Sequence, residues 1–98
     1  MAKKKVINAR SKGSRYERKA KREMEQDGYY VTKAGASLGE WDLVCFNMEH
    51  LRLIQVKSNY CRLEEKRRLE EFQAPDFATK ELWIYKDRVA DAVKTVFE

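Results

Sequence analysis

The sequence lacks the features of several protein classes. It has no run of about 18 apolar residues, so we expect no membrane-spanning helix. Its basic start, MAKKKVINARSKG, is not followed by an apolar stretch, which argues against a secretory signal. The chain of 98 residues has one proline and no repeat, so one domain is the natural expectation. We expect a protein of the cytoplasm, of the nucleoid or of a phage-infected cell that is neither secreted nor bound to a membrane.

Residues that bind zinc are scarce. The chain has two cysteines, Cys45 and Cys61, and one histidine, His50. The cysteines form no CxxC pair, and a structural zinc site needs about four such ligands. We interpret both cysteines as free thiols in a reducing compartment, and we expect Cys45 to be buried in its apolar run.

Positive charge is abundant and unevenly distributed. The net charge is +5, but residues 1–25 hold ten Lys or Arg against three acids, which leaves −2 for the rest. Such a patch is typical of a protein that binds a polyanion, although a solubilising tail would have the same composition. A membrane surface fits less well because this segment lacks a strong apolar face. The candidate DNA contacts are Lys3, Lys4, Lys5, Arg10, Lys12, Arg15, Arg18, Lys19 and Arg22.

The first helix is predicted from its end signals. Ser14 and Glu17 match the S-x-x-E capping box, and Gly28 can end the helix, which gives a range of about 15–26. Its thin apolar face is Tyr16, Ala20 and Met24, at helical spacing. Residues 1–12 then form a flexible basic arm, and 13–98 form a single domain.

The remaining segments alternate between strand and helix signals. We expect strands at 29–32, 41–46, 51–57 and 81–86, helices at 62–73 and 87–98, and a glycine-containing loop at 33–40. Pro75 places 74–80 in a loop. Because a helix precedes 81–86, that strand could join the sheet in parallel.

Polar residues interrupt the strand LRLIQVK at regular spacing. Leu53, Gln55 and Lys57 share one face, because side chains alternate along a strand. If residues 47–50 form a four-residue hairpin loop, Phe46 pairs with Leu51. Asp42 then lies opposite Gln55, on the face that also carries Lys57.

A carboxylate, an amide oxygen and an ammonium group at one place can hold a cation and a phosphate. Magnesium prefers hard oxygens, such as those of Asp42 and Gln55. A cation there lowers the pKa of water, and Lys57 can orient that water or stabilise charge on the phosphate. The same residues could be a partly exposed sheet face with an Asp–Lys pair. Glu17 could likewise be no more than the capping partner of Ser14.

The ordered set of motifs resembles the PD-(D/E)xK nucleases of the restriction-endonuclease-like fold. Within them it is most similar to archaeal-type Holliday junction resolvases and small phage-type nucleases. KGSRYER is similar to their first-helix motif, GYYVTKAGASLGEWDLV to the segment ending at the metal-binding aspartate, and IQVKS to the E-x-K motif. The resemblance implies an α/β fold with a mixed sheet of about four strands flanked by helices, in the order α-β-β-β-α-β-α.

The resemblance also implies an activity. It implies a DNA endonuclease, dependent on Mg²⁺ or Mn²⁺, that hydrolyses phosphodiesters to 5′-phosphate and 3′-hydroxyl ends. The implied metal ligands are Asp42, Gln55, the Val56 carbonyl and Glu17. Lys57 would position the nucleophile, and Ser37 would contact the phosphate or a water on the metal.

Two positions depart from the pattern. Trp41 precedes the aspartate in place of proline, and the literal Pro75-Asp76 pair follows the lysine, where it has no such role. Gln55 stands where the family usually has an acid, so the site has two carboxylates. We expect weaker metal binding, a preference for manganese, or loss of catalysis.

The length of the chain bears on the substrate and on the assembly that we expect. A nuclease of this length has little room for sequence readout, so branched junctions, flaps or nicked duplex are plausible substrates. Cutting both strands of a junction favours a homodimer, with the last helix, Trp83 or Phe97 at its interface. Two other hypotheses remain open. One is a DNA-binding module on a decayed nuclease fold, and the other is a small basic RNA-binding or ribosome-associated protein.

Overall fold

A computed structural model describes residues 9–35 and 39–97, with only the backbone for 9–13. It contains two helices and five strands in the described part of the chain. In chain order they are α1 (Ala9–Gln26), β1 (Tyr30–Lys33), β2 (Leu43–Phe46), β3 (Leu51–Ser58), α2 (Leu63–Glu71), β4 (Ala78–Tyr85) and β5 (Val93–Phe97).

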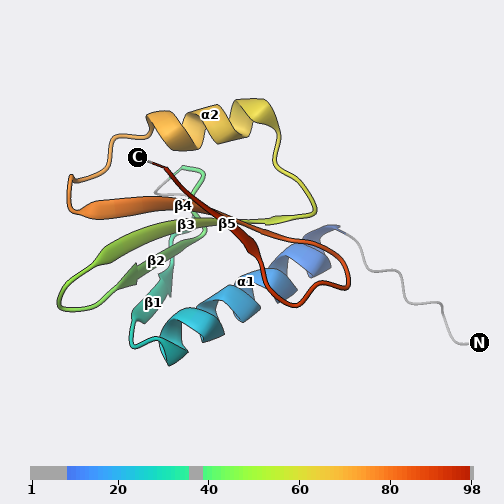
Figure 1. The fold of residues 1–98 in the computed structure, drawn as a ribbon, viewed down its shortest axis with the longest axis horizontal. Helices are drawn as coiled ribbons and strands as arrows, with labels where there is room; N and C mark the ends of the chain where they lie inside the picture. The colour runs from blue at the N-terminus through green and yellow to red at the C-terminus, as the bar shows by residue number, and fades with distance from the viewer. Residues whose placement is uncertain (1–8, 36–38, 98) are drawn as a thin grey trace, which may run out of the picture.

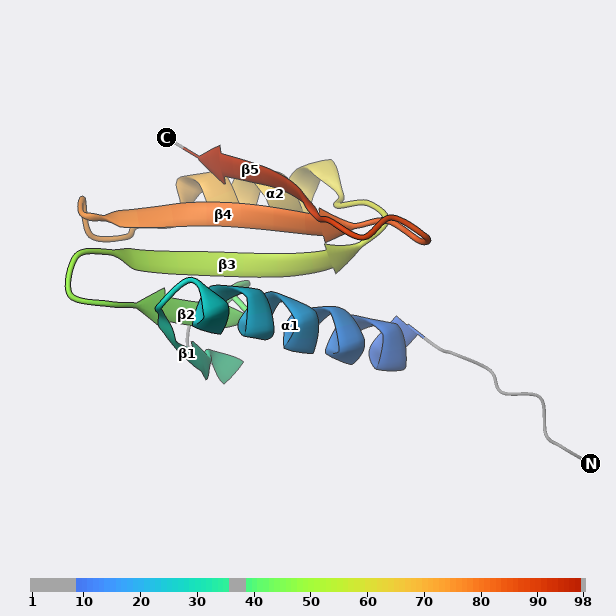
Figure 2. The same ribbon diagram turned by 60° about the horizontal axis from the view of Figure 1, so that its bottom comes forward.

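The five strands form one mixed sheet in the order β1-β2-β3-β4-β5 (Figure 2). The β2–β3 hairpin has the predicted register, with Phe46 paired to Leu51 and Leu43 to Ile54. β4 lies parallel to β3, as predicted for a strand that returns after a helix, while the other neighbours are antiparallel. The carboxyl ends of β3 and β4 therefore meet at one end of the sheet.

The helices cover opposite faces of the sheet (Figure 1). The predicted apolar stripe of α1, Tyr16, Ala20 and Met24, is buried in a cluster that includes Ile54 and Trp83. On the other face, Leu69 of α2 packs in a cluster with Trp41, Leu53 and Leu82. Because side chains alternate, β3 sends Ile54 toward α1 and Leu53 toward α2.

The helix α1 begins earlier than the sequence predicts. It starts at Ala9, so Ser14 and Glu17 lie inside it and the predicted capping box is wrong. Ala, Arg and Lys favour helix strongly enough to carry it through Gly13, whose interior position costs about 1 kcal/mol. Residues 9–12 are thus helical, while the first part of the expected flexible arm lies outside the described residues. The predicted end is confirmed, since Gly28 has φ 91°.

The predicted C-terminal helix is wrong. Residues 93–97 form β5, antiparallel to β4, with Ile84 paired to Val93 and Lys80 to Phe97. Val, Thr and Phe favour strands, and the open edge of β4 offers backbone hydrogen bonds to this segment. β4 also begins at Ala78, three residues before the predicted start, so the element order is α-β-β-β-α-β-β.

Candidate functional site

The candidate site lies where β2 begins and β3 approaches its carboxyl end. The Asp42 N–H donates to the Ile54 carbonyl at 2.9 Å, although Ile54 is already paired with Leu43. Asp42 therefore lies outside the regular β2–β3 ladder, and the predicted pairing of Asp42 with Gln55 does not follow from the register. Both residues come from a hairpin closed by a short loop, in which Asn47 N–H donates to the His50 carbonyl at 3.0 Å.

The Asp42 carboxylate accepts a hydrogen bond that a backbone carbonyl would accept if β2 were longer. Its Oδ2 accepts a hydrogen bond of 2.8 Å from the Val56 N–H. The N–H and C=O of one strand residue point to the same edge. The Val56 carbonyl therefore points toward the same edge as Asp42, where it can serve as a further oxygen ligand.

The environment of Asp42 favours a cation. Burial raises the pKa of this carboxyl to about 6; the Val56 N–H lowers the pKa and Glu17 raises it. Lys57 lowers it and Glu40 raises it as smaller effects. The two carboxylates Glu17 and Asp42 are thus close enough to repel, and a divalent cation would relieve both the repulsion and the desolvation.

Gln55, on β3, provides a buried acceptor without a partner in the described part of the chain. Its side chain is only 7% exposed, and its Oε1 has no hydrogen-bond partner within the described residues. A buried acceptor without a donor costs about 1–3 kcal/mol. A hard cation accepts such an oxygen as a ligand, so the donor set of Asp42, Gln55 and the Val56 carbonyl fits Mg²⁺ or Mn²⁺.

Lys57 has a partner that the sequence did not reveal. Its Nζ donates to Oε2 of Glu65 in the first turn of α2, at 2.7 Å. The Arg62 N–H donates to the other oxygen of Glu65 at 3.4 Å. The bond from Lys57 lowers the pKa of Glu65. The hairpin register does not show where α2 lies. The only signal for this contact in the sequence is that an acidic residue, Glu65, follows β3.

Glu17 reaches the site from the other face of the sheet. Its Oε1 lies 4.0 Å from the Nζ of Lys33, at the end of β1, and its side chain is 26% exposed. Glu40, which lies near Asp42, pairs with Arg68 of α2 at 3.0 Å. Among the described residues, no group of three or more His, Cys, Asp or Glu side chains is placed to hold a metal ion. A cation here would therefore depend on Gln55 and a backbone carbonyl.

The other predicted site residues are placed only in part. Ser37, Lys3, Lys4 and Lys5 lie outside the described residues, as do the side chains of Arg10 and Lys12. Arg15, Arg18, Lys19 and Arg22 are exposed on α1. Arg15 stacks over the ring of Tyr16, with 5.3 Å between its guanidinium carbon and the ring centroid.

Trp41, which stands in place of the motif's proline, and the literal Pro75-Asp76 pair lie in different parts of the molecule. Trp41 is 1% exposed and packs edge-on against Phe72, with 5.6 Å between ring centroids, so this position anchors α2's face of the core. Pro75 and Asp76 are exposed in the loop before β4. They lie beyond the opposite end of β3, because that loop leads into the strand that pairs Ala78 with Leu51.

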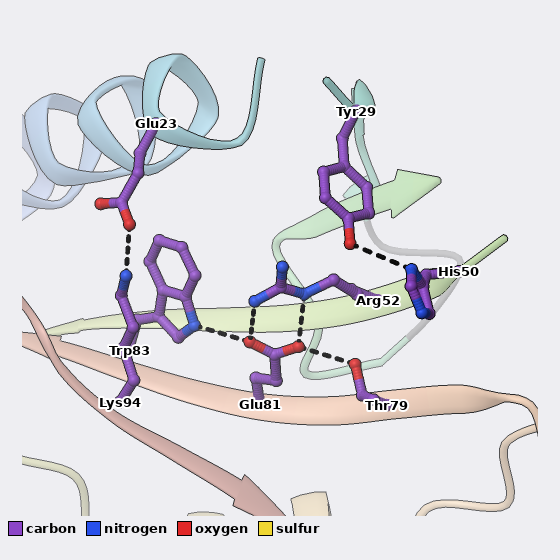
Figure 3. Close-up of polar contacts among 8 residues, drawn as sticks. All are labelled: Glu23, Tyr29, His50, Arg52, Thr79, Glu81, Trp83 and Lys94. Atoms are coloured by element: carbon purple, nitrogen blue, oxygen red, sulfur yellow. Dashed lines mark hydrogen bonds and ion pairs between the residues drawn. The ribbon is translucent and has the colours of Figure 1, made fainter. Parts of the chain in front are cut away.

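A second polar cluster lies at that opposite end (Figure 3). Arg52 makes a bidentate pair with Glu81 at 2.7 and 2.8 Å, and Thr79 and Trp83 donate to the same carboxylate at 2.6 and 3.0 Å. Burial alone would raise the pKa of Glu81, but these bonds outweigh burial and lower it. All acceptor positions are taken up within the protein. This cluster therefore stabilises the fold, whereas the Gln55 oxygen remains available.

The comparison with solved structures identifies the fold. No family model and no curated protein matches the sequence. Among solved structures, the chain is similar to a Holliday junction resolvase from the archaeal hyperthermophile Archaeoglobus fulgidus. The TM-score is 0.67 and the identity 24%, over 89% of this chain and 72% of that chain. The fold is restriction-endonuclease-like. The resemblance to PD-(D/E)xK nucleases is thus confirmed as a likeness of fold, with a sheet of five strands where about four were predicted.

Neither described helix has the length and apolar character needed to cross a bilayer.

Proposed function

We propose that this protein is a metal-dependent DNA endonuclease that selects Holliday junctions or other branched DNA. The observation that supports it best is a partly buried carboxylate, Asp42, whose pKa is raised to about 6, on the same β2–β3 hairpin as the buried Gln55 oxygen, which has no partner among the described residues. Perturbed acids and unsatisfied polar atoms cluster at functional sites more often than elsewhere. The likeness to a Holliday junction resolvase supports the choice of substrate.

The proposed roles follow from chemistry and position. Asp42, Gln55 and the Val56 carbonyl hold Mg²⁺ or Mn²⁺, with Glu17 as a direct or water-mediated ligand. When bound, the ion polarises the phosphodiester and lowers the pKa of water. Lys57, held by Glu65, orients the attacking water and stabilises the charge that develops on the phosphate. Ser37 contacts the phosphate, and the products carry 5′-phosphate and 3′-hydroxyl ends.

A homodimer is the assembly we propose for cutting two strands of a junction. The interface suggested by the sequence needs revision, because residues 93–97 are a strand and Trp83 is fully buried. Val93 and Val96 of the edge strand β5 are about half exposed, at 53% and 52%. β5 is therefore the apolar edge that a second copy could cover. The two free thiols, Cys45 and Cys61, suit a reducing cytoplasm.

Cleavage assays test the proposed activity. Wild-type protein is incubated with labelled four-way junction, flap and linear duplex in Mg²⁺ or Mn²⁺, beside Asp42→Asn and Lys57→Met. We expect the wild type to cut branched DNA in preference to duplex, and both variants to lose at least about 100-fold in rate. Both variants should bind junction DNA with nearly wild-type affinity. Absence of cutting in either metal would contradict the proposal.

A second candidate is a DNA-binding module on a decayed nuclease fold. The uncharged Gln55 favours it, since the described residues contain no group of three acidic or His/Cys ligands. Gln55→Glu distinguishes the two candidates. In a working nuclease, a third carboxylate should tighten Mg²⁺ binding about tenfold or more and lower the concentration needed for cutting. In a decayed one, the variant gains metal affinity without cutting, or gains neither.

A further inference from the structure

We propose that a basic cavity between α1 and the β4–β5 loop binds one internal backbone phosphate of the DNA, separate from the scissile one. The cavity has a volume of about 350 Å³, within the range usual for ligand sites. Four cationic side chains line it: Arg15, Lys19, Lys86 and Arg88. This inference rests on the proposed function, and it adds Lys86 and Arg88 to the DNA-binding surface.

The cationic side chains of the cavity have N–H donors that are available to a ligand. No ion pair between described residues involves Arg15, Lys86 or Arg88, and all three are exposed. Lys19 donates one hydrogen bond to the Ala90 carbonyl at 2.6 Å, which leaves two N–H donors of its ammonium group. The cavity thus presents positive charge that the described chain does not neutralise directly.

The loop that carries Lys86 and Arg88 is fixed in place. The Asp87 N–H donates to Asn59 Oδ1 at 3.1 Å, and Asn59 Nδ2 donates back to Asp87 Oδ2 at 3.4 Å. The hydroxyl of Tyr16 donates to Asp87 Oδ1 at 3.3 Å, so α1 also contacts the loop. The side chain and the N–H of Asp87 are thereby engaged by Asn59 and Tyr16.

Arg88 adopts a backbone conformation that needs support. Its φ is 66°, in the left-handed region that non-glycine residues seldom adopt. Such a residue persists only where its surroundings hold it, and this is common at ligand-binding sites. The bonds of Asp87 to Asn59 and Tyr16 provide that support. Ordering the loop in advance reduces the entropic cost of binding a phosphate.

The cavity lies at the same end of the sheet as the candidate active site. β3 and β4 are parallel, with Lys57 paired to Ile84 and Ser58 to Tyr85, so Lys86 follows one strand over from Lys57. Figure 2 shows both arrowheads, the β4–β5 loop and the first turns of α1 at this end. The backbones of Lys57 and Lys86 are on the order of 10 Å apart. Lys57 points toward α2 while the cavity lies against α1, so a DNA strand that contacts both has to pass the end of the sheet.

A charge-matched pair of variants tests the cavity. Lys86→Gln combined with Arg88→Asn removes two cations, and Asn tolerates the left-handed conformation at that position. The control, Lys66→Gln with Arg67→Gln, removes the same two charges from exposed positions on α2, which covers the opposite face. Affinity for a four-way junction is measured in EDTA over a range of salt concentrations.

We expect the cavity variant to bind roughly 10- to 100-fold more weakly near 100 mM salt. The slope of log affinity against log salt should fall by about 1 to 2. The control should change both quantities by much less. An equal loss in the control would show an effect of net charge alone and overturn the inference.

Neutral methylphosphonate groups, placed singly along the junction strands, locate the contact. Substitution at one internal position should weaken wild-type binding and leave the cavity variant unaffected. If only removal of a terminal 5′-phosphate has this effect, the cavity binds a strand end and the inference is wrong. A protein that cuts no DNA contradicts the proposed endonuclease, while the binding data in EDTA still decide the cavity.

Discussion

Asp42 and Gln55 differ in what each could contribute to the candidate site. Asp42 brings a charge that burial makes costly, and Gln55 brings an oxygen without charge. Two carboxylates and two neutral oxygens bind a divalent ion more weakly than three carboxylates do. Burial raises the pKa of Asp42 to about 6, so a cation bound there would compete with a proton at that pH.

Asp42→Asn should change how stability depends on pH. The pKa of Asp42 is about 6 in the folded protein against an ordinary 3.8, so folding favours the protonated form. Its contribution to stability is fully present below about pH 4 and is lost as the pH rises through 6. Asn resembles the protonated acid at every pH. Allowing for partial exposure, we expect wild type to lose roughly 1–2 kcal/mol relative to the variant between pH 4 and 8.

Urea unfolding in EDTA at several pH values measures this difference. Addition of Mn²⁺ at pH 8 should restore stability to the wild type and have little effect on the variant. A difference between the two proteins that stays constant from pH 4 to 8 would show that Asp42 is not held in a desolvated position.

Glu65→Gln tests whether the ion pair orients Lys57. Gln can still accept from the Arg62 N–H but loses the charge that holds the ammonium group at 2.7 Å. We expect the single-turnover cutting rate to fall about tenfold while junction affinity stays equal or improves slightly. Glu64→Gln is the matched control, since its side chain is exposed in the same helical turn. Equal rates for the two variants would leave Glu65 without a role in positioning.

At the scale of helices and strands, the sequence predicted the pairing of β2 with β3 better than the structure near the two ends of the chain. The β2–β3 register followed from one loop length, because alternation and a short turn fix each partner. The register could not reveal the contact between Lys57 and Glu65, because that contact depends on how α2 packs against the sheet. β5 was mistaken for a helix, since Val89, Val93 and Phe97 have helical spacing while Val, Thr and Phe favour strands. The open edge of β4 decided between the two.

The early start of α1 gives a test at the same scale. Gly13 lies inside the helix, so Gly13→Ala should stabilise the protein by about 0.5–1 kcal/mol in urea unfolding. Ser14→Ala should change stability by less than about 0.5 kcal/mol, because Ser14 is not the N-cap. A helix that began at Arg15 would give the reverse pattern, with a loss of about 1 kcal/mol for the serine variant.

For the whole molecule, we expect the largest loss of stability when the buried Arg52–Glu81 pair is broken. Arg52→Met leaves Glu81, which is 2% exposed, without its main partner. Removing one member of a buried pair costs about 3–5 kcal/mol, a large share of the stability of a small domain. Arg68→Met breaks the exposed pair with Glu40 and should cost less than about 1 kcal/mol. Thermal unfolding at pH 7 compares the two, and similar losses would contradict this assignment.

The parallel pairing of β3 and β4 has a consequence for the order of folding. Leu51 pairs with Ala78 only after the whole α2 crossover has closed, whereas Phe46 pairs with Leu51 across four residues. Loop closure therefore favours the hairpin first. Asp42, Gln55 and Val56 all belong to that hairpin, while Glu17 and Glu65 come from elements that dock onto the sheet. A nascent chain can thus gather the oxygens that we propose as metal ligands before Glu17 and Glu65 dock beside them.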